Sequence, residues 1–235
     1  MTLQVTFTYS ESLDLGFNNS TEFIIEQLWH GTRSVHQNSF GYLKRLSASG
    51  CDTLEHVIPS HLLSCFQNLE VLQVWDCRNA EVIFSINDEN RVTKASGIFR
   101  LKSLYLKNLP ELKDVWDKDP KGIIGFQLLK EMNVSKCERL KSLFPASVAK
   151  DLTGLELIEV TECKELAEIF TKHGEGEGTT QHSVFPRLTT LTLQHLPCLK
   201  YSIHSKEQVI LTTLPLRPFK LVHIYLYIML EKIKA

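Results

Sequence analysis

Cysteine and histidine are the residues of this chain with the most varied chemistry, because they ligate metals, act as nucleophiles and, for cysteine, form disulfides. The 235 residues include six cysteines and nine histidines. No two cysteines stand in the C-x-x-C spacing of a zinc site, and no histidine falls in an H-E-x-x-H frame. His173 and His182 lie in a polar, glycine-rich segment, where solvated histidines are expected. The sequence therefore predicts no metal site.

The glycine run Gly174-x-Gly176-x-Gly178 has the composition of a phosphate-binding loop but lacks its other features. Such a loop follows a strand, opens a helix and is completed by Lys-Ser/Thr, whereas this run has glutamates between its glycines, which repel phosphate. Serine, histidine and acidic residues are plentiful, but none stands in the G-x-S-x-G frame of a hydrolase. We therefore expect no nucleotide or other cofactor and no enzymatic activity.

Four of the six cysteines recur at one phase of an internal repeat. Each is the last residue of a nine-residue segment that begins with leucine and has apolar residues at its first, fourth and sixth positions. These segments are residues 43–51, 69–77, 129–137 and 155–163. Two further copies, residues 101–109 and 188–196, have leucine in place of the cysteine.

The template L-x-x-L-x-L-x-x-C-x-x-L is the signature of a leucine-rich repeat. A second apolar cluster follows in most copies, as in Leu112, Val115 and Trp116. An aromatic residue precedes most copies, namely Phe40, Phe66, Phe99, Phe126 and Phe185. In L-x-L both side chains point to the same side of a strand, and one unit cannot bury them alone, whereas stacked units form a continuous core.

These repeats predict an α/β repeat fold, a leucine-rich-repeat solenoid. We expect a curved stack with parallel strands on its concave face and an irregular or short-helical convex side. The cysteines at the repeated phase are expected to point into the core as small apolar side chains rather than to form disulfides. Cys65 and Cys198 lie off this phase and receive no assignment.

The repeats divide the chain into three predicted parts. These are residues 1–39, a degenerate repeat or cap, residues 40–200, an array of about six repeats, and residues 201–235, an atypical cap. In the first part, Trp29 matches Trp116 of a regular repeat, and in the last part the alternation over residues 222–230 predicts a strand. Two polar insertions, at 85–97 and 171–183, are expected opposite the main strands.

The charge and hydropathy of the chain exclude several classes of protein. The 26 basic and 27 acidic residues give a formal net charge of −1 and are interspersed, whereas nucleic-acid-binding proteins usually carry a basic patch. No apolar run reaches the ~20 residues that span a bilayer, and the N-terminus lacks the basic region and apolar core of a secretory signal. We therefore expect a cytoplasmic monomer with no nucleic-acid partner and no membrane span.

Several repeats resemble those of a known protein family. Residues 66–74 (FQNLEVLQV), 109–116 (LPELKDVW) and 137–145 (CERLKSLFP) are similar to the leucine-rich-repeat region of plant coiled-coil nucleotide-binding disease resistance proteins. The resemblance extends over about residues 26–201. It implies a protein-recognition module of plant defence and innate immunity. The partner that it implies is a pathogen effector, a guarded host protein or a neighbouring nucleotide-binding domain.

The chain departs from the complete receptors of that family in two respects. It lacks the G-x-x-x-x-G-K-S/T motif and has no heptad coiled coil, so the resemblance implies neither ATP nor ADP binding. The chain is then a fragment, a truncated relative or a stand-alone repeat protein. An alternative function is a scaffold or adaptor, such as the substrate receptor of a ubiquitin ligase. Residues 1–39, however, do not resemble the helical adaptor-binding segment that this function requires.

Partner binding is predicted for residues between and beside the strand leucines, because repeat proteins commonly bind on that surface. These residues are Gln73, Trp75, Lys102, Tyr105, Lys107, Lys130, Asn133, Glu156, Glu159 and Thr192. Trp75 and Tyr105 are the expected anchors, since exposed aromatics are favoured at interfaces. The strands near 101 and 129 carry lysines, whereas the strand near 155 carries glutamates. This distribution favours a partner with acidic groups opposite the lysines and basic groups opposite the glutamates.

Overall fold

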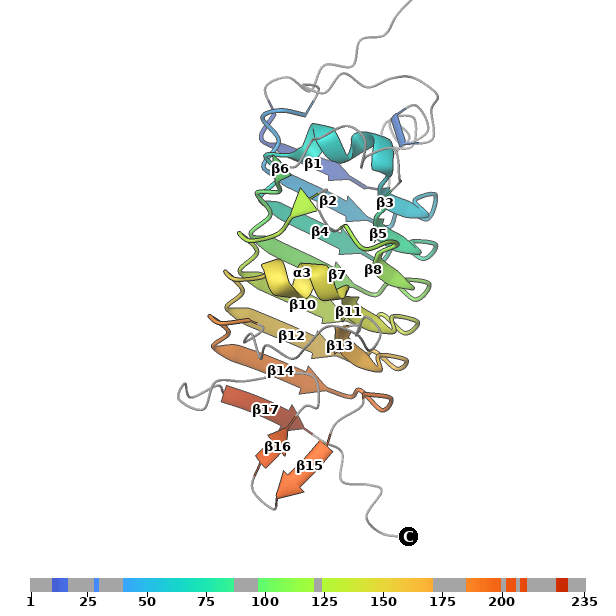
Figure 1. Cartoon of the computed structure of the whole chain (residues 1–235). Coiled ribbons are helices and arrows are strands. Elements are labelled where there is room, and N and C mark those ends of the chain that lie inside the picture. The colour runs from blue at the N-terminus through green and yellow to red at the C-terminus, as the bar shows by residue number, and fades with distance from the viewer. Residues whose placement is uncertain are drawn as a thin grey trace, which may run out of the picture.

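A computed structural model describes most of the chain, and the parallel solenoid predicted from the repeats is confirmed. The described residues are 10–16, 28–29, 40–86, 97–120, 124–170, 185–199, 202–205, 208–210 and 223–227. The main sheet has eight strands, each paired in parallel with its neighbour, in the order β1-β2-β4-β7-β10-β12-β14-β17 (Figure 1). Their bounds are Ser12–Leu15, Arg45–Ser49, Val71–Trp75, Ser103–Lys107, Glu131–Ser135, Leu157–Thr161, Thr190–Gln194 and His223–Tyr227.

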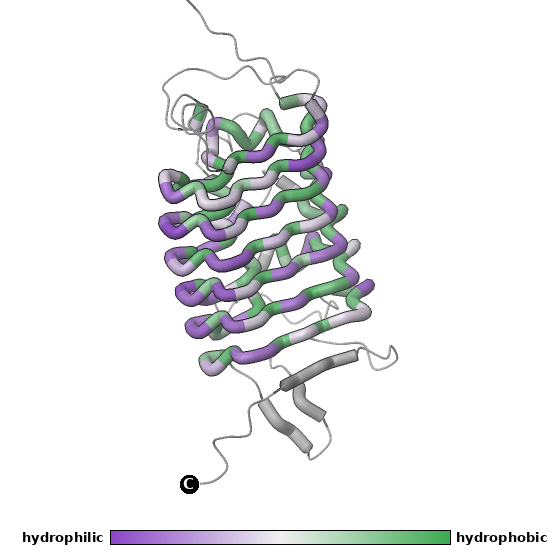
Figure 2. The backbone as a smooth tube through the Cα atoms, turned by 180° about the vertical axis from the view of Figure 1, so that it is seen from behind, coloured by the Kyte–Doolittle hydropathy of each residue, from purple (hydrophilic) through white to green (hydrophobic). Residues whose placement is uncertain are grey.

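The alternation of apolar and polar residues decides which face of each strand is buried. In β7, Leu104 and Leu106 are buried, whereas Tyr105 between them points outward and is half-buried. The register places Leu104 between Leu72 of β4 and Met132 of β10, so apolar side chains form ladders along the stack. Figure 2 shows the same alternation in the hydropathy of successive strands. Each fully buried leucine stabilises the fold by roughly 1.5–3 kcal/mol.

The opposite side of the solenoid consists of very short elements, as expected for its convex side. Short parallel sheets are formed by β3 (His56–Ile58), β5 (Val82–Phe84) and β8 (Asp114–Trp116), by β11 (Ser142–Phe144) and β13 (Glu168–Phe170), and by β6 (Gly97–Ile98) and β9 (Ile124–Gly125). Two short helices, η2 (Ser60–Phe66) and α3 (Ala146–Asp151), lie on this side (Figure 1). An antiparallel pair, β15 (Ser202–Ser205) and β16 (Gln208–Ile210), follows β14 in the chain.

Aromatic rings fill the core behind these short strands. The ring centroid of Trp116 lies 5.5 Å from that of Phe84 and 5.1 Å from that of Phe126. Nearer the N-terminus, the rings of Phe40 and Phe66 stack at 4.8 Å. Aromatic pairs at such distances contribute about 0.5–1.5 kcal/mol beyond the burial of their area. The aromatic residues that precede most repeats in the sequence therefore link neighbouring repeats.

The residue that directly follows each regular strand of the main sheet has a left-handed backbone conformation. These residues are Gly50, Asp76, Asn108, Lys136, Glu162 and His195, with φ between 54° and 64°. The amides of the first five continue the hydrogen bonding between repeats, as Asp76 N does by donating to the carbonyl of Lys107 at 3.0 Å. A left-handed conformation costs about 1 kcal/mol or more for a residue other than glycine. The next residue is a cysteine or leucine in all six turns, and in five of them its side chain is buried in the core.

The two predicted end regions each contribute a strand to the main sheet. β1 lies within residues 1–39 and pairs with β2, and β17 lies within residues 201–235 and pairs with β14. The strand predicted near the C-terminus is thus found at His223–Tyr227. His173, His182 and the glycine run between them lie outside the described residues, as does most of both polar insertions.

Candidate functional site

The outward side chains of the main sheet form three rows that run along the solenoid, and we call them together the main-sheet face. The register aligns the central residue of each strand with the central residue of the next. This middle row contains Ser47, Gln73, Tyr105, Asn133, Glu159 and Thr192. Every residue of this row except Ser47 was predicted to bind a partner. Five predicted partner-binding residues therefore lie side by side on successive strands.

Hydrogen bonds between neighbouring strands orient three side chains of the middle row. The Tyr105 hydroxyl donates to Oε2 of Glu131 at 2.8 Å, and Asn133 Nδ2 donates to Oε2 of Glu159 at 2.7 Å. Burial and the hydrogen bond to Glu131 raise the pKa of Tyr105, so its hydroxyl stays protonated and donating at neutral pH. The face thus presents oriented polar groups, which lose less conformational entropy on binding than mobile side chains do.

Several charged side chains at the edge of the main-sheet face where the strands begin form ion pairs between repeats. Lys102 Nζ lies 2.8 Å from Oε2 of Glu70, and Lys44 Nζ lies 2.7 Å from Oε1 of Glu11. The hydrogen bond from Lys102 lowers the pKa of Glu70. Because these side chains are largely exposed, each pair contributes little to stability. Lys102, a predicted partner-binding residue, therefore already has an ionic partner within the chain.

Other predicted residues have no such partner. The side chains of Lys107, Lys130 and Glu156 make no ion pair or hydrogen bond with the part of the chain that the structure describes. The register places Lys107 directly beside Trp75, whose indole is partly exposed. Trp75 and Lys107 are therefore an aromatic and a cationic group, side by side, at the end of their strands.

The sequence did not predict the pairing of side chains across the repeats. Tyr105 and Glu131, for example, are 26 residues apart, and their contact depends on the register of two strands. The repeat offset contains this information, since aligning the leucines of two copies also aligns the residues between them. The left-handed turns also escaped prediction, although they place Asn108 Nδ2 2.6 Å from Oδ1 of Asp76 at the rim of the face.

The cysteines at the repeated phase are buried in the core, as predicted. Cys51, Cys77, Cys137 and Cys163 are free thiols that interact with backbone groups of their turns, as in the 3.3 Å contact of Cys77 Sγ with the carbonyl of Trp75. Cys65 is also buried, and Cys198 is exposed. No group of three or more histidine, cysteine or acidic side chains is arranged to hold a metal ion in the described part of the chain.

None of the helices among the described residues is long and apolar enough to cross a membrane. Over the ranges that the structure describes, the longest helical element is η2, Ser60–Phe66.

Comparisons with known proteins point to one family. Residues 13–164 match the family described as plant disease resistance protein RPS2-like, leucine-rich repeats. A probable disease resistance protein of Arabidopsis thaliana is 33% identical over 197 residues, which are 80% of this chain and 17% of the relative. A putative disease resistance protein of the same plant is 29% identical over 155 residues, 58% of this chain and 12% of the relative. The chain thus spans a small part of either relative, and no solved structure matches it significantly.

Proposed function

The chain belongs to the RPS2-like leucine-rich repeats of plant disease resistance proteins, and from that premise we propose that it recognises another protein through the main-sheet face. Its role is sensing: the partner is a pathogen effector, a host protein that effectors modify, or a neighbouring nucleotide-binding domain. It acts by binding rather than by catalysis, and it acts in the cytoplasm.

The alignment of the middle row is the observation that carries the proposal. Gln73, Tyr105, Asn133, Glu159 and Thr192 stand side by side on five successive strands. A row of regularly spaced polar side chains offers hydrogen-bonding groups to an extended protein surface. Such a surface suits a protein partner, whereas a small molecule is usually bound in a concave pocket.

The aromatic residues supply the expected energetic centre of this surface. Trp75 and Tyr105 lie on neighbouring strands, and both are partly exposed. Tryptophan and tyrosine are enriched among the few interface residues that dominate binding energy. Lys107 beside Trp75 adds an unpaired positive charge, and Glu156 and Glu159 of the β12 repeat add negative charge farther along the stack. The partner is therefore expected to carry acidic groups over β7 and basic groups over β12.

An affinity experiment with the double variant Trp75→Ala, Tyr105→Ala tests the proposal. The unchanged chain and the variant are immobilised, and plant extract with and without pathogen protein is passed over each. We expect at least one protein that the unchanged chain retains and the variant does not. With the purified partner, the variant should bind at least about tenfold more weakly, since the loss of one strong anchor residue costs 2 kcal/mol or more.

Tyr42→Ala is the matched control for this experiment. Tyr42 is an aromatic residue with 60% of its surface exposed, and it precedes β2 rather than lying on the main-sheet face. This variant should bind as the unchanged chain does, and circular dichroism should be the same for all three proteins. If every retained protein binds the double variant with unchanged affinity, the main-sheet face is not the recognition surface.

A further inference from the structure

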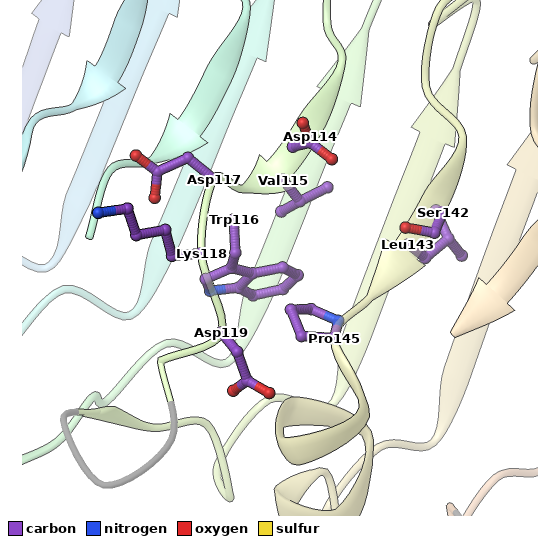
Figure 3. Close-up of a pocket in the computed structure, with 9 residues that line it drawn as sticks. All are labelled: Asp114, Val115, Trp116, Asp117, Lys118, Asp119, Ser142, Leu143 and Pro145. Atoms are coloured by element: carbon purple, nitrogen blue, oxygen red, sulfur yellow. The ribbon is translucent and has the colours of Figure 1, made fainter. Parts of the chain in front are cut away.

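A second surface feature lies away from the main-sheet face, on the side of the solenoid that carries α3. There the end of β8 and the residues after it meet β11 and Pro145, the residue before α3 (Figure 3). Between them is a pocket of about 180 Å³, which is room for one side chain. Its wall contains Trp116, and its rim contains the carboxylates of Asp114, Asp117 and Asp119 together with the exposed side chain of Lys118.

Trp116 has an unsatisfied hydrogen-bond donor at this pocket. The residue is 4% exposed, and its Nε1–H has no hydrogen-bond partner among the described residues. Trp29 is a matched comparison, because it is also 4% exposed but donates its Nε1–H to the carbonyl of Val57 at 2.7 Å. An indole N–H can only donate, and buried polar groups in folded proteins almost always have a partner.

Neighbouring aromatic rings restrict how the indole can turn toward a partner in the described part of the chain. Its ring is held between the rings of Phe84, at 5.5 Å, and Phe144, at 5.9 Å, and contacts Phe126 at 5.1 Å. Figure 3 shows the nitrogen on the side of Asp119 and the six-membered ring toward Pro145. The N–H is therefore fixed at the pocket wall, where an acceptor supplied by another molecule would satisfy it.

The three carboxylates differ in the number of hydrogen bonds that they accept within the chain. Asp117 accepts hydrogen bonds from the Ile86 amide at 2.7 Å and from the Ser85 hydroxyl at 2.8 Å, and Asp119 accepts one from the Ser147 hydroxyl. Asp114 is exposed and has no hydrogen bond or ion pair within the described part of the chain. Burial and the nearby charge of Asp117 raise the pKa of Asp114 more than the charges of Lys141 and Lys113 lower it.

These groups define the chemistry of the missing ligand. Three carboxylates outnumber the single cation Lys118 at the rim, so the rim repels phosphate and acidic side chains and attracts a cation, whereas the indole N–H requires an acceptor. We propose that the pocket receives an arginine side chain from a segment of a partner protein. The guanidinium pairs with the Asp114 carboxylate, and a main-chain carbonyl of the same segment accepts from Trp116 Nε1. Arginine fits better than lysine, because its planar group pairs with a carboxylate through two hydrogen bonds and is less strongly hydrated.

The probe that tests this site is N-acetyl-arginine amide, which carries both a guanidinium and amide carbonyls. The chain contains three tryptophans, so a ¹⁵N-labelled sample gives three indole N–H signals in an NMR spectrum, and Trp116→Phe identifies the signal of Trp116. We expect the Trp116 signal to move downfield saturably as the probe is added, with smaller changes at Trp29 and Trp75. N-acetyl-glutamine amide, which has the carbonyls but no charge, should bind at least about tenfold more weakly.

Two variants separate the pocket from a general charge effect. Asp114→Asn should weaken binding of the arginine probe by about tenfold or more. Asp52→Asn, which removes an aspartate that belongs to another turn and lies 4.0 Å from Arg78, should leave binding unchanged. The variant Trp116→Phe should remain folded, since it keeps an aromatic ring in this cluster while removing the N–H donor and part of the ring, and should bind the probe more weakly.

Three results would overturn the proposal. The first is the absence of a saturable shift at Trp116 up to tens of millimolar probe. The second is equal affinity for the arginine and glutamine probes, and the third is undiminished binding by folded Trp116→Phe. None of these results depends on the main-sheet face, so the failure of this site is distinguishable from a failure of the proposed function.

Discussion

At the scale of single residues, the residue that follows each left-handed turn shows how burial changes the reactivity of a side chain. Cysteine occupies it in four repeats and leucine in two, and five of these six side chains are buried. The hydrogen bond with Cys163 and burial raise the pKa of Cys137, and the hydrogen bond with Cys51 and burial do the same for Cys77. Since the thiolate is the reactive form, the raised pKa keeps Cys77 and Cys137 unreactive, whereas the hydrogen bonds with these two thiols lower the pKa of their partners Cys51 and Cys163.

Alkylation measures this effect. Near pH 8.5, close to the ordinary pKa of a thiol of about 8.5, iodoacetamide should modify exposed Cys198 in the folded chain and leave Cys77 and Cys137 unmodified. After unfolding in urea, all six cysteines should react at similar rates. Peptide mass spectrometry gives the extent of modification at each site. Modification of Cys137 in the folded chain at the rate of Cys198 would contradict the assignment of a protected core thiol.

Residue types and repeat phase predicted burial well but not hydrogen bonding. The sequence placed Trp29 and Trp116 at equivalent positions, and both are 4% exposed. Of the two, only Trp29 has an acceptor among the residues that the structure describes, the carbonyl of Val57, because that contact depends on the local path of the neighbouring repeat. The pocket beside Trp116 has the same origin. The pocket forms where β8 lies close to Pro145. These residues belong to different repeats, so the spacing of residues within one repeat does not predict it.

At the scale of elements, the main strands were predictable and the short ones were not. The L-x-L pattern locates β7, because Leu104 and Leu106 need a shared buried side. Three-residue strands such as β8 have too few residues for a pattern of their own, and they form because neighbouring repeats pair there. The helices η2 and α3 are six or seven residues long, so the packing of the repeats rather than helix propensity decides where they form.

Gly154 shows how closely the backbones of neighbouring repeats approach. A Cβ at this position would lie 2.5 Å from the carbonyl oxygen of Gln127, which belongs to backbone and cannot swing away. Gly154→Ala should therefore lower the free energy of unfolding by about 1–3 kcal/mol, as overpacking does. Urea denaturation at equilibrium measures the difference.

Gly16→Ala is the control for Gly154→Ala, because a Cβ at residue 16 meets no atom within 4 Å. Its effect should be within about 0.5 kcal/mol of zero. Gly125→Ala should lie between the two, since the added Cβ meets the side chain of Gln127, at 2.5 Å from its Nε2, and a side chain can move. Equal stability of Gly154→Ala and the unchanged chain would show that the two backbones are farther apart.

At the scale of the whole molecule, each repeat contacts chiefly the repeats before and after it. Every strand of the main sheet pairs with its immediate neighbours, and no strand of that sheet closes the stack into a barrel among the described elements. Stability in such an array is a sum of repeat and interface contributions. A weakened repeat therefore has consequences that depend on its place in the stack.

Leu104 and Leu191 test this dependence, because both are fully buried, in β7 and β14 respectively. Each substitution by alanine should cost about 2–5 kcal/mol. In Leu191→Ala, hydrogen exchange should rise around β12 and β14 while β2 and β4 keep their protection. In Leu104→Ala, exchange should rise on both sides of β7. A uniform rise along the chain in both variants would instead indicate a single cooperative unit.

The placement of the three tryptophans gives the molecule an optical property. Trp29 and Trp116 lie within groups of phenylalanine rings, shielded from water, whereas Trp75 lies partly exposed on the main-sheet face. Shielded indoles emit fluorescence at shorter wavelengths than hydrated ones and are reached less readily by quenchers such as acrylamide. The long-wavelength, quenchable part of the emission therefore belongs to Trp75, and it reports the occupancy of the main-sheet face without an attached label.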